Sequence, residues 1–159
     1  NTRAQAEAFV GACRYPPLGY RSLGPTRANL IMGGDYAKFA NDHILTMAMV
    51  ETKEAVENID AIASVPGLDM IFVGSGDLRL SLTGTFGYES EDADIDAALA
   101  VIIAACQRHN LIAGVFVNSV EYGAKMLQRG FRFVTVKTDS SLLLDYARQI
   151  VQQTKTQIK

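Results

Sequence analysis

The sequence predicts an α/β fold built on a parallel sheet, and three observations support this. Four apolar, strand-like runs, at residues 45–51, 68–74, 111–117 and 131–137, each precede a stretch with helical character. The runs are continuous rather than alternating, which is typical of parallel strands that are covered on both faces. They recur about every 20–40 residues, a spacing that fits right-handed β–α–β crossovers.

Helical signals follow each of these runs. After the first, we expect a helix over residues 52–67 with Thr52 as its N-cap and an apolar face of Ala55, Ile59, Ile62 and Val65. After the second, a loop rich in Gly, Thr and acidic residues leads to an apolar helix over residues 94–109.

The third run leads to a helix with Ser119 as its N-cap and Gly130 at its C-terminal end. The fourth leads to a final helix over residues 142–153.

The first part of the chain differs from this repeating pattern. Residues 2–14 predict a helix with Thr2 as its N-cap, and residues 15–25 form a loop rich in Pro and Gly. Residues 26–43 predict short helical pieces broken at Gly33-Gly34. Without an internal repeat or a linker, residues 1–159 are expected to form a single domain.

Composition narrows the class of protein. The 159 residues carry a net charge of −2 and no basic block, which disfavours nucleic acid and anionic membrane surfaces as partners. The longest apolar run, residues 97–106, is too short to cross a bilayer, and no signal peptide is evident. Cys13 and Cys106 lie in no metal or redox spacing, so we expect reduced, core-packed thiols and a cytoplasmic location.

Two acids follow neighbouring strand-like runs. Glu51 ends the first run, and Asp77 follows the second in the stretch IFVGSGDL, residues 71–78. Because ligands of parallel α/β folds bind at the carboxyl ends of strands, these carboxylates could share a hard cation such as Mg²⁺ or Mn²⁺. The N–H groups of residues 74–77 would then face an anionic ligand oxygen. From spacing alone, helix capping by Asp77 is favoured over metal binding.

Four sequence blocks carry a family resemblance. They are CRYPPLGYRSLGP (13–25), ETKEAVENIDAI (51–62), VPGLDMIFVGSGDLRLSL (65–82) and GFRFVTVKTDSSLL (130–143). Together, and in this order, they resemble the HpcH/HpaI family, the metal-dependent (class II) pyruvate aldolases of the phosphoenolpyruvate/pyruvate superfamily. The resemblance implies a TIM (β/α)8 barrel, of which this chain supplies the last four β/α units.

The resemblance also implies an activity and a site. Glu51 and Asp77 would bind Mg²⁺, Mn²⁺ or Co²⁺, and the amides of Gly74, Ser75 and Gly76 would hold the carboxylate of pyruvate.

The resemblance also implies that Pro17 and Tyr36 border the opening through which the substrate enters. The implied reaction is aldol cleavage or formation of 4-hydroxy-2-oxo acids through a pyruvate enolate. The implied partners are pyruvate or another 2-oxo acid plus an aldehyde, and further copies of the chain in a trimer or hexamer.

The sequence departs from the family in several places. The family's histidine base and substrate-binding arginine lie upstream of Asn1, and we expect His43 and His109 at the opposite end of the sheet. Since half a barrel leaves open sheet edges, we expect the N-terminal half to lie elsewhere in a longer protein. Ser75 replaces a usual proline, and Lys137 either recognises an anionic group or extends into solvent.

Three alternatives to the aldolase stay open. Oxaloacetate decarboxylation and a macrophomate-synthase-like carbon–carbon bond formation both use the same metal enolate. A non-catalytic half-barrel that keeps the carboxylates but lacks the base is the third.

Overall fold

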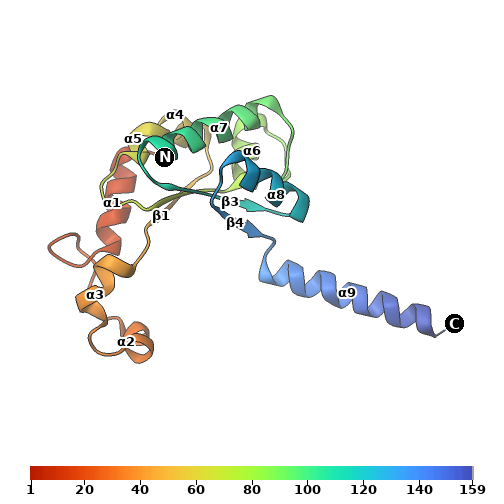
Figure 1. The fold of residues 1–159 in the computed structure, drawn as a ribbon, viewed down its shortest axis with the longest axis horizontal. Helices are drawn as coiled ribbons and strands as arrows, with labels where there is room; N and C mark the ends of the chain where they lie inside the picture. Colours follow the sequence, from red (N-terminus) through yellow and green to blue (C-terminus); the bar gives the residue numbers. More distant parts are fainter. Residues whose placement is uncertain (159) are drawn as a thin grey trace.

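The computed structural model describes residues 1–158 and contains one parallel sheet (Figure 1). Its strands are β1 (Met47–Val50), β2 (Met70–Val73), β3 (Ile112–Val117) and β4 (Phe133–Val136), in the order β1-β2-β3-β4. Each strand lies within one of the apolar runs, so the predicted parallel α/β fold is confirmed.

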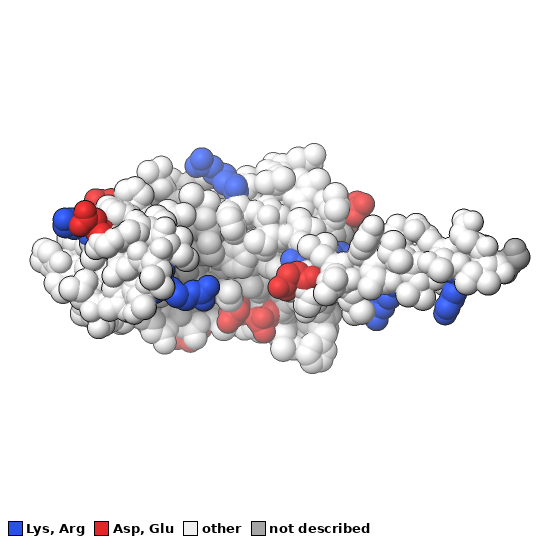
Figure 2. Space-filling view, turned by 90° about the horizontal axis from the view of Figure 1, so that it is seen from below, with Lys and Arg blue, Asp and Glu red and all other residues white. Residues whose placement is uncertain are grey.

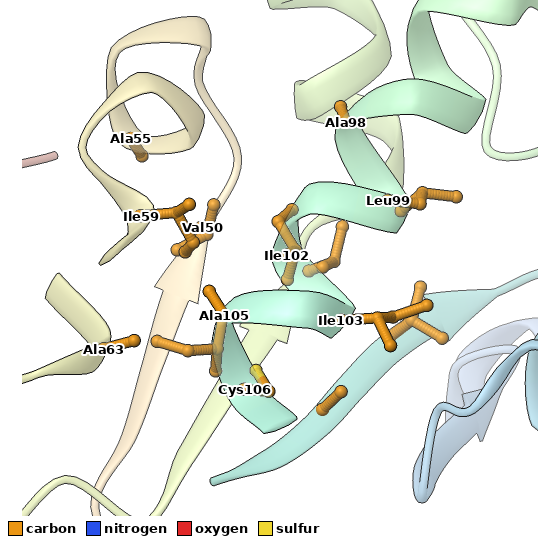
Figure 3. Close-up of a cluster of buried hydrophobic side chains, with 14 of the residues drawn as sticks. Val50, Ala55, Ile59, Ala63, Ala98, Leu99, Ile102, Ile103, Ala105 and Cys106 are labelled. Atoms are coloured by element: carbon orange, nitrogen blue, oxygen red, sulfur yellow. The ribbon is translucent and has the colours of Figure 1, made fainter. Parts of the chain in front are cut away.

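Helices cover one face of this sheet (Figure 1). They are α4 (Lys53–Glu57), α5 (Ile59–Ala63), α6 (Ser75–Thr83), α7 (Ala93–Arg108) and α8 (Val120–Arg129). The strands pack against these helices through a row of valines that are aligned across the sheet: Val50, Val73, Val115 and Val134. Figure 3 shows Ile102 and Ala105 of α7 directed toward Val50 of β1 and toward the side chains of α4 and α5. Burial of these aliphatic side chains is the main force that holds the layers together.

The other face of the sheet carries large apolar side chains that the described residues leave open. Met49, Phe72, Gly114 and Phe133 share one row across the four strands. Met49 is 56% exposed and Phe133 is 39% exposed. In a closed β/α barrel this face points into the packed interior. The sheet is therefore consistent with part of such a barrel.

Two helical expectations differ from the structure. The single helix expected over residues 52–67 is instead the pair α4 and α5, which meet at Asn58 (φ −96°, ψ 8°). The loop expected directly after the second strand is preceded by α6, which ends at Gly84 in a left-handed conformation (φ 70°). The glycines at the start of α6 have low helix propensity and conceal the helix in the sequence.

The N-terminal segments follow the predicted order. They are α1 (Arg3–Cys13), α2 (Thr26–Met32) and α3 (Tyr36–His43), and Thr2 caps α1 in a capping box. Capping by Thr52 and Ser119 and the left-handed Gly130 are likewise confirmed.

The last helix, α9 (Asp139–Gln157), extends away from the sheet and has no buried residue among those described (Figure 1). Over the described residues, no helix combines the length and the apolar character that crossing a membrane requires. Figure 2 shows acidic and basic side chains scattered in small groups over the face in view.

Candidate functional site

The carboxyl ends of β1 and β2 bring the predicted acids to one edge of the sheet. Glu51 directly follows β1, and Asp77 lies in the first turn of α6, which begins right after β2. Val50 pairs in register with Val73, and the Gly74 amide donates to the Val50 carbonyl at 3.2 Å. Glu51 therefore stands beside the start of α6, as expected for neighbouring parallel strands.

Gly74 makes room for the Glu51 carboxylate. A Cβ atom at Gly74 would lie 2.6 Å from Glu51 Oε2 and 3.1 Å from Glu51 Cβ. The backbone of Gly74 (φ −79°) is open to any residue, so space and not conformation requires glycine here. The contact also shows that the carboxylate is directed across the start of α6. Sequence reasoning assigned Gly74 only an amide role and missed this one.

The first turn of α6 offers backbone donors at the same place. The amides of Ser75, Gly76 and Asp77 belong to the first turn, where a helix provides no carbonyl partners, and Gly74 at the N-cap has no side chain to accept from them. The first bond of the helix runs from the Leu78 amide to the Gly74 carbonyl at 2.9 Å. Since the helix dipole adds positive potential, this turn suits an anionic oxygen.

The Ser75 side chain points away from this turn. Its hydroxyl is buried, has no hydrogen-bond partner among the described residues, and lines a small cavity with Leu78, Ile95 and Tyr122. Ser75 therefore contributes an amide to the site and not a hydroxyl.

The donor set fits a divalent ion. Glu51 and Asp77 offer hard carboxylate oxygens just beyond the ends of two adjacent strands. Mg²⁺ or Mn²⁺ is commonly held by one or two carboxylates plus substrate and water oxygens. No cluster of three or more His, Cys, Asp or Glu side chains that could hold a metal occurs among residues 1–158. The described residues therefore supply two carboxylates to a divalent ion, and oxygens of the substrate and of water would complete its coordination.

Pro17 and Tyr36 lie at the other end of the strands. Tyr36 packs with Tyr15 in a small cluster before β1. Arg14, next to Tyr15, donates to Asp69 at 3.2 Å, and Asp69 immediately precedes β2. The described residues do not bring Pro17 or Tyr36 to Glu51 and Asp77, and their place at a substrate mouth stays a prediction.

The histidines also occupy the amino ends of strands, as expected. His43 ends α3 before β1, and His109 separates α7 from β3 and lies 3.1 Å from Asp60. The Arg108 guanidinium, together with His109, holds the pKa of Asp60 below its usual range.

Lys137 is paired with an acid of the last helix rather than extending freely into solvent. It has a left-handed backbone (φ 61°), and its ammonium donates to Asp145 of α9 at 2.5 Å. That ammonium lowers the pKa of the Asp145 carboxyl.

Comparison with known proteins identifies the family of the chain. The model of the HpcH/HpaI aldolase/citrate lyase family matches residues 1–145. The chain belongs to this family. A hydroxypyruvate/pyruvate aldolase of Rhizorhabdus wittichii is 37% identical over 151 residues, which are 95% of this chain and 60% of that protein. A 4-hydroxy-2-oxovalerate aldolase of Novosphingobium aromaticivorans is 38% identical over 143 residues, covering 87% of this chain and 53% of that protein.

Solved structures give the same result. The crystal structure of an HpcH/HpaI aldolase/citrate lyase family protein from Burkholderia cenocepacia matches with a TM-score of 0.84 at 29% identity, over 97% of this chain and 62% of that one. Macrophomate synthase, at 22% identity and a TM-score of 0.74 over 98% of this chain and 57% of that one, shares the fold. The chain therefore spans somewhat more than half the length of the proteins that it matches.

Proposed function

We propose that this chain carries the metal- and carboxylate-binding part of a class II pyruvate aldolase, a carbon–carbon lyase that cleaves or forms 4-hydroxy-2-oxo acids. The observation that carries the proposal is the Glu51 carboxylate lying against Gly74, beside Asp77 and the first turn of α6. The family and its aldolase relatives supply the reaction class.

Each part of the site has a role in this proposal. The amides of Ser75, Gly76 and Asp77 bind and orient the pyruvate carboxylate, assisted by the dipole of α6. Glu51 and Asp77 would hold Mg²⁺, Mn²⁺ or Co²⁺. A bound ion would supply Lewis-acid chemistry for the keto group of pyruvate and the charge of its enolate.

The general base lies outside the described site. Because His43 and His109 stand at the amino ends of strands, neither is placed to take a proton from the pyruvate methyl group. The family resemblance assigns that step to a histidine upstream of Asn1. The proposed protein is therefore a complete (β/α)8 barrel in which this chain forms the last four units.

The alternatives share the same donor site. Oxaloacetate decarboxylation and macrophomate-synthase-like bond formation also need an anion cradle and a metal ion. The likeness to macrophomate synthase concerns the fold alone, whereas several relatives above 30% identity are aldolases, which favours the aldolase. A non-catalytic half-barrel would bind the ion and leave pyruvate unchanged.

Proton exchange of pyruvate tests the proposal directly. With Mn²⁺ or Mg²⁺ in D₂O, the full-length protein is expected to exchange the pyruvate methyl protons, which NMR follows as loss of the methyl signal. Glu51→Gln and Asp77→Asn should each abolish exchange, and Glu54→Gln, an exposed acid in the first turn of α4, should leave it intact. Exchange that persists in both site variants would overturn the assignment.

We also propose that α9 packs against further copies of the chain in a trimer or hexamer. Its exposed apolar residues include Leu143, which is 73% exposed, and Ile150, which is 44% exposed. Replacing both with Asp should lower the mass measured by light scattering, while Gln153→Asp should not. An unchanged mass in the double variant would contradict the role of α9. The cytoplasmic location and the absence of nucleic-acid and membrane partners stay predictions.

A further inference from the structure

The loop between α6 and α7 returns to the site and places an aromatic ring against it. A Cβ atom at Gly76 would lie 3.0 Å from Cε1 of Tyr88, so the Tyr88 ring rests on the turn that carries the amides. On its other side this ring meets Phe116 of β3 edge to face, with centroids 5.4 Å apart. Tyr88 is 53% exposed, which leaves about half of its surface open to a ligand.

Polar contacts fix the position of this loop. The Glu89 carboxylate accepts from the backbone amides of Asn118 and Ser119, at 2.9 and 2.5 Å, and from the Ser119 hydroxyl at 2.9 Å. Arg79 donates to the Glu89 carbonyl at 3.0 Å and to the Thr85 hydroxyl at 3.2 Å. Because these bonds flank Tyr88 on both sides in sequence, the ring is held in place by α6 and α8.

The loop and α6 enclose a hollow beside Asp77. Its volume is about 240 Å³. Since ligand pockets usually span about 300–1,000 Å³, it suits one substituent of a ligand rather than a whole one. The residues that line it are Gly76, Asp77, Leu80, Phe86, Gly87 and Tyr88. Phe86 is 84% exposed and Leu80 is 39% exposed, so the walls are apolar and accessible.

We propose that this hollow is the subsite for the aldehyde that reacts with the pyruvate enolate, and that Tyr88 makes it selective for aldehydes with an apolar or aromatic group. The inference rests on the proposed function, because Asp77 belongs to both the metal site and the wall of the hollow. None of the six lining residues is a cation that could pair with an anionic group. The guanidinium of Arg79, which lies against Gly87, already donates to Thr85 and to the Glu89 carbonyl. An acceptor with a phosphate or sulfonate group is therefore disfavoured.

In the proposed reaction, the new carbon–carbon bond forms where the metal site meets the hollow. The methyl carbon of the pyruvate enolate bonds to the carbonyl carbon of the aldehyde, and the aldehyde oxygen takes up a proton to become the 4-hydroxyl group. All other atoms of both substrates are retained in the product. The substituent of the aldehyde then extends from the metal side over Tyr88 and Phe86.

The test compares two acceptors in the full-length protein with Mn²⁺ and pyruvate. Benzaldehyde probes the apolar hollow, glycolaldehyde is a small polar reference, and the ratio of their kcat/KM values is the readout. This ratio is expected to favour benzaldehyde and to fall about tenfold or more in Tyr88→Ala and in Phe86→Ala. Tyr88→Phe keeps the ring and should keep the ratio. Misfolded molecules lower both rates equally, so the ratio reports selectivity alone.

The outcomes separate the two proposals. Pyruvate exchange in the wild type, with the same acceptor ratio in Tyr88→Ala, would overturn the acceptor subsite and leave the aldolase proposal standing. A wild type without pyruvate exchange would overturn the aldolase proposal and the subsite with it. Exchange together with a lowered ratio in Tyr88→Ala and a preserved ratio in Tyr88→Phe is the result that we expect.

Discussion

Replacing Gly74 with alanine should disturb the metal site while leaving the fold largely intact. The added Cβ would lie 2.6 Å from Glu51 Oε2, where ordinary contact begins at 3.4 Å. The carboxylate must therefore move by roughly 0.8 Å to regain van der Waals contact. That shift is about four times the 0.2 Å tolerance of a metal–ligand distance. We expect Mn²⁺ binding to weaken about 10- to 100-fold, the usual effect of displacing a ligand through its neighbour.

Electron paramagnetic resonance measures this loss as free Mn²⁺ in a titration of the full-length protein. Gly24→Ala is the matched control, because a Cβ at Gly24 would meet nothing within 4 Å. Circular dichroism checks that both variants fold. A Gly74→Ala protein that binds Mn²⁺ as tightly as the wild type would refute the placement of Glu51 at the ion.

Four further predictions concern stability and thiol reactivity. Ser75→Ala removes a buried, unpartnered hydroxyl and should stabilise the protein by up to about 1 kcal/mol in urea unfolding; destabilisation would show that the hydroxyl has a partner. Arg14→Met leaves the carboxylate of Asp69 without its cation and should cost about 3 kcal/mol in the same assay, where a loss below about 1 kcal/mol would argue against a structural role. Burial raises the pKa of the Cys106 thiol from 9.0 to about 11, so iodoacetamide at pH 8 should label the half-buried Cys13 first, and equal labelling of both thiols would contradict this. The same raised pKa should make the free energy of unfolding decline as the pH rises from 9.0 to about 11, because the thiol of the unfolded chain ionises first; a constant free energy of unfolding over this range would contradict it.

The strands were predictable because each is a short apolar run bounded by polar or turn-forming residues. Their ends were less predictable, since residues such as Leu68 and Phe131 are buried without belonging to a strand. The helix α6 was missed because Gly74 and Gly76 weaken the local helical signal, and its place is decided by packing of Leu78 into the core.

For the candidate site, the sequence predicted which strand ends carry the acids but not the contacts around them. Glu51 and Asp77 could be paired because the order of parallel strands brings their carboxyl ends together. The fit of Glu51 against Gly74 and the return of Tyr88 to Gly76 depend on tertiary contacts, which the spacing of residues along the chain does not reveal.

The central claim is that Glu51 and Asp77 bind one divalent ion together, and a double-mutant cycle of Mn²⁺ affinity tests it most directly. Glu51→Gln, Asp77→Asn and the double variant would be titrated by electron paramagnetic resonance, with Glu54→Gln as the control. We expect each single site variant to bind at least about tenfold more weakly and the two effects to be strongly non-additive, since both ligands act on one ion. Wild-type affinity in either single variant, or effects that simply add, would contradict a shared site.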